Sequence, residues 1–350
     1  MKQEYHVIGV MSGTSLDGID LCEVIFTLSE GWSFKILASE TVAYPTNWKR
    51  RLQEAVTFSE VALQQLNIDY TSYLSEVITS FIDQYAIKEL DAVCSHGHTI
   101  LHQPENGRTL QIGNLPQLAT LVGQKVVCDF RVQDVSMGGQ GAPLVPIGDK
   151  LLFSRYDYCL NLGGFANCSF EKEAKRIAYD ICPVNIVLNF YAEKLGKPYD
   201  EGGEIAASGT LEKVLLEKLN SIEFYDYAPP KSLGLEWVQQ HIFPKLEASG
   251  LVSEDILTTF TEHVAMQLAS QFSKSASVFV TGGGTYNDYL LSRVKFYQEL
   301  VLVMPSEEII EFKEALIFGL LGVLKLRNEV NCLASVTGAT KDHSSGEIFK

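Results

Sequence analysis

The chain has 350 residues, with 28 Lys and Arg against 43 Asp and Glu, and a formal net charge of −15. This length predicts about two domains, and a hydrophobic share of 46% with 20% charged residues excludes a largely disordered chain. The acidic excess argues against a protein that binds nucleic acid, because neutralising phosphates requires clustered Lys and Arg.

The cysteines and the apolar segments indicate the compartment. There are seven cysteines, an odd number, widely spaced and without a Cys-x-x-Cys pair, which is typical of reduced thiols rather than of a disulfide framework. The N-terminus opens into a strand pattern without an apolar signal region, and the longest apolar stretch, Ala315 to Leu324, is too short to span a bilayer. We therefore expect a cytoplasmic protein with no membrane partner.

Hydrophobic periodicity predicts an alternating α/β chain. In the first half the expected strands are 7–10, 19–26, 34–44, 90–95 and 125–130, and the expected helices are 47–58, 59–85 and 116–124. In the second half they are a strand–turn–strand unit at 158–170, a strand at 278–281, and helices at 184–195, 258–275, from 287, and 311–327. A glycine-rich stretch at 138–141 is the expected domain crossover. This crossover predicts a first domain at 1–140 and a second domain at 141–332. The tail at 333–350 is expected to pack back on the first domain.

The first glycine-bearing loop contains Gly13 and Gly18 and lies between the strands predicted at 7–10 and 19–26. A phosphate-binding P-loop and a dinucleotide-binding loop both lead into a helix, whereas a strand follows Gly18 here, so neither motif fits. A strand–loop–strand hairpin can still hold phosphate, because glycines let the backbone approach, Thr14 and Ser15 offer hydroxyl groups, and Asp17 can hold Mg²⁺ through water. An ordinary hairpin turn remains the alternative.

Two later glycine turns favour the functional interpretation. Gly163 and Gly164 lie in a second strand turn, and Gly282 to Gly284 follow a buried strand and precede a helix. Two hairpins from two halves of a chain, followed by a late glycine turn, are the pattern of the actin–hexokinase–sugar kinase fold. The sequence therefore predicts two related ribonuclease H-like α/β domains with ATP in the cleft between them.

More specific motifs occur along the whole chain. The segment Gly9 to Asp20 resembles the signature of the anhydro-N-acetylmuramic acid kinases. Further matches to that family follow in order at residues 95–99, 111–113, 129–131, 141–146, 161–167, 229–232, 281–284, 314–315 and 336–339.

This resemblance implies an ATP- and Mg²⁺-dependent phosphotransferase that acts on an alcohol group. Water opens the internal bridge of 1,6-anhydro-N-acetylmuramic acid, and the freed O6 receives the γ-phosphoryl group. The product, N-acetylmuramic acid 6-phosphate, enters peptidoglycan recycling. The chain is thus expected to act on a small amino sugar, and a homodimer is the one assembly considered. Two alternatives stay open: another sugar kinase of the same fold, and a non-catalytic ATP-binding actin-like protein.

The resemblance also assigns residues. Asp180 is the expected catalytic base. The expected ATP and Mg²⁺ residues are Gly13, Thr14, Ser15, Leu16, Asp17, Gly18, Asp20, Gly163, Gly164, Gly282, Gly283 and Gly284. The expected sugar contacts are His96, His98, Thr99, Asn185 and Glu314, although a surface position for Glu314 is nearly as plausible.

One segment departs from the family pattern. The family's catalytic loop usually reads Asp-Thr-Gly-Pro-Gly-Asn, whereas this chain has Asp180-Ile181-Cys182-Pro183-Val184-Asn185. Asp180 still provides a carboxylate that can take a proton from water. Capping of the helix that starts near Val184 is its alternative role. Cys182 is expected to be a buried packing residue.

Other polar residues leave their roles open. Cys94, His96 and His98 alternate along a strand pattern, with His102 close by, so one face could bind a metal. The family carries Gln at the position of His98 and needs no metal beyond the Mg²⁺ that accompanies ATP, so sugar contacts or packing are the favoured roles. Lys231 either steers phosphate or is a solvated charge.

Overall fold

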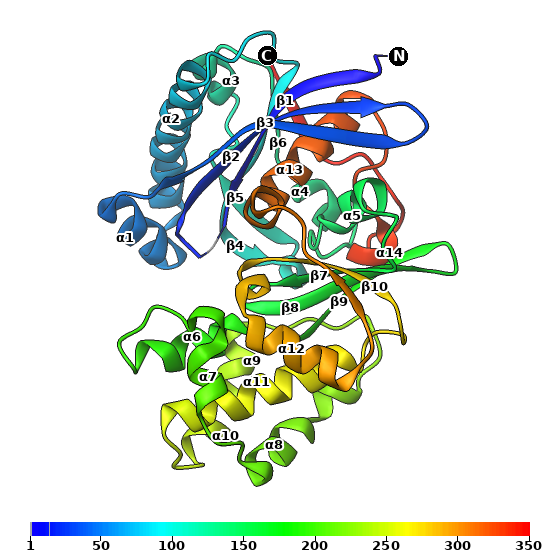
Figure 1. The fold of residues 1–350 in the computed structure, drawn as a ribbon. Helices are drawn as coiled ribbons and strands as arrows, with labels where there is room; N and C mark the ends of the chain where they lie inside the picture. The colour runs from blue at the N-terminus through cyan, green and yellow to red at the C-terminus, as the bar shows by residue number, and fades with distance from the viewer. Residues whose placement is uncertain (1, 14) are drawn as a thin grey trace. The chain divides into compact units, whose positions relative to one another are not determined.

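The computed structural model describes residues 2–13 and 15–350 and divides into two compact units. Unit 1 comprises Met1–Leu152 and Phe312–Lys350, and unit 2 comprises Phe153–Glu311. The sequence predicts domain boundaries after residues 140 and 332, whereas the units of the structure divide after residues 152 and 311. The second division comes earlier because the helix α13 (Glu307–Leu326) packs along the sheet of unit 1 (Figure 1).

Unit 1 is built on a mixed sheet in the order β12-β6-β4-β1-β2-β3, with β5 paired to β4. Its strands are β1 (Glu4–Ser12), β2 (Gly18–Leu28), β3 (Trp32–Ala43), β4 (Ala92–Gln103), β5 (Arg108–Ile112), β6 (Val126–Cys128) and β12 (Glu347–Phe349). The first three strands form antiparallel hairpins, and β4 and β6 then add in parallel. Its helices are α1 (Thr46–Glu54), α2 (Glu60–Gln84), α3 (Gln117–Val122), α4 (Val132–Ser136), α5 (Pro146–Leu152) and α14 (Ala334–Thr337).

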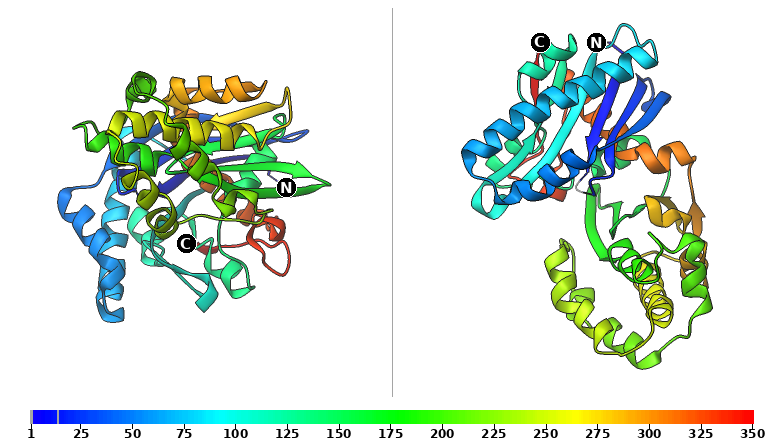
Figure 2. Two further views of the ribbon diagram at one scale, coloured as in Figure 1. Left: turned by 90° about the horizontal axis from the view of Figure 1, so that it is seen from below. Right: turned by 90° about the vertical axis from the view of Figure 1, so that its left-hand side faces the viewer.

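Helices cover both faces of this sheet (Figure 1). Successive side chains of a strand point to opposite faces, and the contacts follow that alternation. On β1, Ile8 and Val10 join the apolar core formed with α2, whereas Val7 and Gly9 face α13. Figure 2 shows α2 running along the strands of unit 1. The sheet is therefore a buried layer, which explains its near-continuous apolar strands.

Gly9 allows the closest approach between the sheet and α13. A Cβ placed on Gly9 would lie 1.9 Å from the carbonyl oxygen of Ala315, so only glycine fits at this point. Close packing of α13 against β1 therefore explains why residue 9 is a glycine.

Unit 2 repeats the same strand order. Its five strands run β11-β10-β7-β8-β9, where β7, β8 and β9 form two antiparallel hairpins and β10 and β11 add in parallel beside β7. Two sheets with one shared topology define two related ribonuclease H-like units, and this confirms the fold class predicted from the sequence.

The strands of unit 2 are β7 (Tyr158–Leu162), β8 (Phe165–Lys172), β9 (Lys175–Pro183), β10 (Ser277–Thr281) and β11 (Val301–Val303). Its helices are α6 (Asn185–Glu193), α7 (Glu204–Ser208), α8 (Lys213–Asn220), α9 (Leu235–His241), α10 (Phe243–Glu247), α11 (Ser253–Ala269) and α12 (Asp288–Tyr297). Short 3₁₀ turns link these elements, among them η5 (Gly283–Tyr286).

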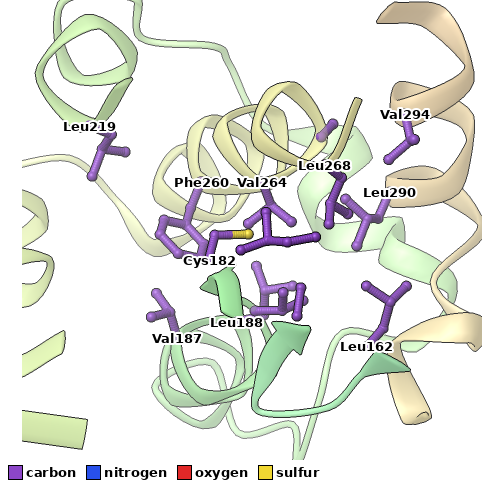
Figure 3. Packing of buried hydrophobic residues seen from close by; sticks show 14 of the residues in the cluster. Leu162, Cys182, Val187, Leu188, Leu219, Phe260, Val264, Leu268, Leu290 and Val294 are labelled. Carbon is purple, nitrogen blue, oxygen red and sulfur yellow. The ribbon is translucent and has the colours of Figure 1, made fainter. Parts of the chain in front are cut away.

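The core of unit 2 lies between its sheet and the helices α6, α11 and α12 (Figure 3). Cys182 is fully buried there, close to Phe260, Val264 and Leu188. Its expected role as a buried packing residue is confirmed. Within the described ranges, no helix combines the length and the apolar character that crossing a membrane requires.

The largest difference from the expected elements concerns the segment that carries Asp180. The resemblance to the family predicts a loop before a helix here. In the structure Lys175–Pro183 is the strand β9, and α6 begins at Asn185. Tyr179 and Ile181 are buried on this strand, so tertiary packing in place of turn-forming glycines decides its path.

Candidate active site

The first candidate phosphate loop connects β1 to β2 in unit 1. Ser12 pairs with Ile19 in an antiparallel hairpin, and the strand β2 begins at Gly18, so a strand and not a helix follows the first glycine loop, as predicted. Ser15 and Asp17 are exposed, and the Leu16 side chain packs against the core of unit 1. Contact between Leu16 and a phosphate would therefore involve its backbone. Thr14 lies outside the described residues.

Two further carboxylates belong to unit 1. Asp20 on β2 accepts a hydrogen bond of 2.6 Å from the Thr41 hydroxyl. Glu314 on α13 has an exposed side chain by accessible area, yet the protein atoms packed around its carboxyl group desolvate it and raise its pKa above the usual range. The charge of Asp20 also raises this pKa, whereas the charges of Arg131 and Lys313 lower it. Asp20 and Glu314 thus influence each other electrostatically although they are far apart in the chain.

His96 is held by protein groups on both ring nitrogens. Its Nδ1 donates to the carbonyl oxygen of Gly97 at 2.8 Å, so Nε2 is the acceptor for Arg131 Nε, also at 2.8 Å. Desolvation, followed by the Arg131 charge, lowers the pKa of His96 well below its ordinary value. His96 is therefore a neutral, buried residue that orients Arg131.

His98 belongs to a polar network that the sequence analysis did not find. Its Nδ1 lies 2.7 Å from Ser12 Oγ, which also bonds to the hydroxyl groups of Tyr44 and Tyr70. Desolvation lowers the pKa of His98 to about 4, so the ring is neutral at pH 7. Tyr70 lies in the helix predicted at 59–85, and periodicity there reports burial and not what a hydroxyl group contacts.

The alternative of a metal site on one face of β4 finds no support among the described side chains. His96 bonds to Arg131 and His98 to Ser12, while a Cβ on Gly322 would lie 2.1 Å from Cys94 Sγ, which shows how closely α13 covers that thiol. Thr99 accepts from Gln111 Nε2 at 3.3 Å, and the exposed His102 lies 3.1 Å from Thr109 Oγ1. Among the described residues these side chains do not converge on one point.

In unit 2 the second hairpin turn is joined to the start of α6. The carbonyl oxygen of Gly164 accepts from the N–H groups of Val184 and Ile186, and that of Gly163 accepts from Asn185. Asn185 Nδ2 also donates to the carbonyl oxygen of Leu162 at 3.2 Å. The turn and Asn185 therefore form one rigid assembly, which places Asn185 beside the glycines rather than apart from them.

The third glycine turn lies against the same assembly. Gly282 has φ +84° and lies close to Asn161, and a Cβ on Gly284 would lie 2.7 Å from Leu162 Cβ. By contrast, a Cβ on Gly283 would find only Asn185 Nδ2, at 4.0 Å, besides its chain neighbours. Close packing therefore explains why residues 282 and 284 are glycines. Gly283, by contrast, borders open space that a ligand can enter.

Asp180 lies on β9 beside a β-bulge. Ala166 pairs with Cys182 and Asn167 with Asp180, so Ile181 is the extra residue in that strand. Oδ2 of Asp180 accepts from the main-chain N–H of Leu233 at 2.8 Å. Desolvation raises the pKa of Asp180 to about 6, and the bond from Leu233 opposes that shift. The helix-capping alternative is wrong, because the first N–H groups of α6 donate to the carbonyl oxygens of Gly163 and Gly164, while the Asp180 carboxylate accepts from Leu233.

Lys231 is half-buried and bonded to main-chain groups rather than a freely solvated charge, and its steering of a phosphate stays a prediction. Its Nζ donates to the carbonyl oxygens of Phe224 and Tyr225 at 3.2 and 3.4 Å and lies 4.7 Å from the centre of the Phe224 ring. The carbonyl oxygen of Lys231 in turn accepts from the N–H of Asp180. Lys231 therefore ties the segment that contacts Asp180 to the 3₁₀ turn at Glu223–Asp226.

Two ribonuclease H-like units of one topology, each with a glycine turn between antiparallel strands, are the fold of the actin–hexokinase–sugar kinase class. Within that class the chain belongs to the anhydro-N-acetylmuramic acid kinase family, whose model matches residues 5–350.

Relatives of that name match over nearly their full length. The one from Mannheimia succiniciproducens is 34% identical, covering 100% of this chain and 99% of the relative. The one from Sulfurimonas denitrificans is 32% identical over 98% and 99%. Similar solved structures include component A of the (R)-2-hydroxyglutaryl-CoA dehydratase of Acidaminococcus fermentans, with 13% identity, a TM-score of 0.46, and 92% and 99% of the two chains covered. Another is a ROK family glucokinase from Streptomyces griseus, with 12% identity, a TM-score of 0.41, and 91% and 99% covered.

Proposed function

We propose that this chain is an ATP-dependent kinase that opens 1,6-anhydro-N-acetylmuramic acid with water and phosphorylates its O6. The product would be N-acetylmuramic acid 6-phosphate, an intermediate of peptidoglycan recycling. Membership of the family over residues 5–350, and relatives of that name matched from end to end, support this proposal.

The environment of Asp180 is the observation that carries the proposal. A carboxylate whose pKa is raised to about 6 is still mostly ionised at pH 7, yet it is more basic than an ordinary aspartate. In the proposed step Asp180 takes a proton from water, the resulting hydroxide adds to the anomeric carbon, and the bond from that carbon to O6 breaks. O6 then receives the phosphoryl group. The bond from Leu233 fixes one carboxylate oxygen and leaves the other for the water.

The glycine turns fit the phosphates of a nucleotide. Gly283 borders open space, and a Cβ on Gly164 would find only Ile186 Cβ, at 3.8 Å, so the backbone is accessible at both turns. We assign the phosphates to two sets of residues: Gly13, Thr14, Ser15, Leu16 and Gly18 in unit 1, and Gly163, Gly164 and Gly282 to Gly284 in unit 2. ATP supplies the transferred phosphoryl group and Mg²⁺ neutralises its charge.

Acidic groups in unit 1 suit the Mg²⁺ ion, which prefers carboxylate oxygens and keeps several waters. Asp17 is exposed in the hairpin loop, and Asp20 lies on the strand that follows it. We assign both to Mg²⁺ through water.

The sugar contacts are assigned more narrowly than the resemblance implied. His98, Thr99 and Glu314 remain candidates, whereas His96 acts through Arg131, because both of its ring nitrogens are occupied. Asn185 is reassigned to the nucleotide turns, since it bonds to Leu162 and borders Gly284. We place the enzyme in the cytoplasm because all seven cysteines are free and buried.

The test is product analysis in ¹⁸O-water with ATP and 1,6-anhydro-N-acetylmuramic acid. We expect a phosphorylated amino sugar with the label on its anomeric hydroxyl group and none in the transferred phosphoryl group. Phosphorylation of ordinary hexoses but not of the anhydro sugar would instead identify another sugar kinase of this fold. ATP binding without any sugar-dependent turnover would identify a non-catalytic protein.

A further inference from the structure

Three buried side chains from distant parts of unit 1 meet at one point. They are Asp134 on α4, Cys332 after α13, and His343 in the C-terminal tail, and their Oδ1, Sγ and Nε2 atoms all lie within 4.8 Å of one another. The exposed fractions of the three residues are 0%, 1% and 7%. Figure 1 labels α4 and also α14, whose Thr337 donates to the same oxygen of Asp134 at 2.7 Å.

The backbone fixes two of these side chains side by side. Cys332 and His343 form an isolated antiparallel bridge in which each N–H donates to the other residue's carbonyl oxygen at 3.1 Å. In such a pair the side chains project to the same side of the bridge. Cys332 Sγ then lies 3.0 Å from Asp134 Oδ1, and His343 Nε2 lies 3.6 Å from the same oxygen.

The tautomer of His343 follows from its other nitrogen. Nδ1 lies 3.1 Å from the carbonyl oxygen of Lys341 and, because a carbonyl only accepts, Nδ1 must carry the proton. In the neutral ring Nε2 then has a lone pair, and it has no hydrogen-bond partner among the described residues. Nε2 lies 3.6 Å from the Oδ1 atom of Asp134, so two acceptor atoms lie near each other in a buried place. A cation between them removes this conflict.

The distances suit a small dication. In a tetrahedral zinc site, oxygen and nitrogen ligands lie about 3.3 Å apart, and oxygen and sulfur ligands about 3.5 Å apart. The observed nitrogen–oxygen distance of 3.6 Å is slightly longer than the first value, and the observed sulfur–oxygen distance of 3.0 Å is shorter than the second. The sulfur–oxygen distance lengthens when the thiol no longer donates a hydrogen bond. We propose that Asp134, Cys332 and His343 bind one Zn²⁺ ion, with the Thr337 hydroxyl group hydrogen-bonded to the ligating oxygen of Asp134. Binding replaces the S–H bond of Cys332 with an S–Zn bond, and the proton leaves to solvent.

The surrounding groups orient the ligands as in known zinc sites. A zinc-bound histidine usually donates its second N–H to a carbonyl oxygen, as His343 does to Lys341, and the ligating carboxylate is itself hydrogen-bonded. Here the main-chain N–H of Gly141 donates to Asp134 Oδ2 at 2.7 Å. The ion would therefore fasten the C-terminal tail to the glycine-rich 138–141 segment.

The experiment uses the full-length chain, stripped with a chelator and titrated with Zn²⁺ or Co²⁺ alone. We expect one ion per chain by elemental analysis, a thiolate-to-cobalt charge-transfer band in the near-ultraviolet, and a Tm that rises with Zn²⁺ concentration. Less than one ion per chain, or bound Co²⁺ without the charge-transfer band, would overturn the proposal.

Two ligand variants and two controls locate the site. Cys332→Ala should abolish the charge-transfer band, and His343→Gln should weaken Zn²⁺ binding at least about tenfold. Cys159→Ala, at a buried cysteine of unit 2, and His241→Gln, at an exposed histidine, should bind as the wild type does. If Cys332→Ala does not fold, His343→Gln and the wild-type stoichiometry still decide. Wild-type affinity in His343→Gln would disprove the assignment.

Discussion

The carboxylate of Asp180 accepts a hydrogen bond of 2.8 Å from the main-chain N–H of Leu233, while the N–H of Asp180 donates to the carbonyl oxygen of Lys231. This double link holds the end of β9 against the 231–233 segment. The β-bulge at Ile181 buries Ile181 and Cys182 together and separates them from Asp180. The desolvated carboxylate is thus oriented by backbone groups that no single side-chain substitution removes.

Replacing Asp180 by Asn tests whether this carboxylate is the general base. Asn keeps the size of the side chain, and its oxygen can still accept from Leu233, but it cannot take a proton from water. We expect kcat to fall by at least about two orders of magnitude, with the ATP Kd almost unchanged, because loss of a general base costs about that much. Steady-state kinetics and nucleotide titration measure both quantities.

The control for this variant is Asp83→Asn, which removes an exposed carboxylate in unit 1 and should leave kcat and Kd unchanged. A fully active Asp180→Asn enzyme would contradict the assignment. So would a variant whose lost activity is explained by lost ATP binding, because Asp180 would then act on the nucleotide.

The pH dependence of kcat should report the raised pKa of Asp180. The base acts in its ionised form, so kcat should be half-maximal near pH 6, reach its full value about one pH unit above that, and fall about tenfold per pH unit well below it. His98, with its pKa lowered to about 4, and His96, lowered well below its ordinary value, are neutral across this range and cannot cause the transition. A pH–rate profile measures the midpoint. An acidic limb near pH 4, as for an ordinary aspartate, would show that Asp180 is not the group observed.

The sequence predicts the parts of the site that local chemistry determines. The hairpin at Gly13 to Gly18 and the glycines at 163–164 and 282–284 could be placed on strands and turns, because glycine and β-branched patterns act over a few residues. The repeated topology of the two sheets then follows from those strands.

The parts that depend on distant contacts could not be predicted. β9 was read as a loop because the strength of a strand depends on its neighbours, and here β8 and the core of unit 2 supply them. The partners of Lys231 and of Ser12 come from turns and strands that no spacing rule connects. Asp134 and Cys332 are separated by almost two hundred positions, so only the fold brings their side chains together.

Gly283 is the position where a side chain should affect the nucleotide without affecting the fold. A Cβ there meets open space, so Gly283→Val should fold with an unchanged Tm and bind ATP at least about tenfold more weakly. The matched control is Gly284→Ala, whose Cβ would lie 2.7 Å from that of Leu162 and should lower the Tm. Thermal denaturation and nucleotide titration separate the two effects. Wild-type ATP affinity in a folded Gly283→Val protein would show that the nucleotide does not approach this turn.

Two tyrosines on α2 provide a paired test of the polar network at Ser12. The hydroxyl of Tyr70 bonds to those of Ser12 and Tyr44, whereas the buried hydroxyl of Tyr73 has no hydrogen-bond partner among the described residues. Tyr70→Phe should therefore lower the free energy of unfolding by about 1 kcal/mol, because it removes a satisfied buried donor and leaves its partners with fewer bonds. Tyr73→Phe should be neutral or slightly stabilising, since it removes a polar atom that gains nothing from burial.

Urea denaturation of the two variants beside the wild type measures this difference. Each substitution removes one hydroxyl oxygen from the same helix and keeps the aromatic ring. The two changes therefore alter helix propensity equally, and each ring keeps its own contacts. Equal losses of stability in both variants would show that the hydroxyl groups contribute only through packing. A larger loss of stability in Tyr73→Phe than in Tyr70→Phe would contradict the prediction, because the hydroxyl group of Tyr73 would then stabilise the fold more than that of Tyr70.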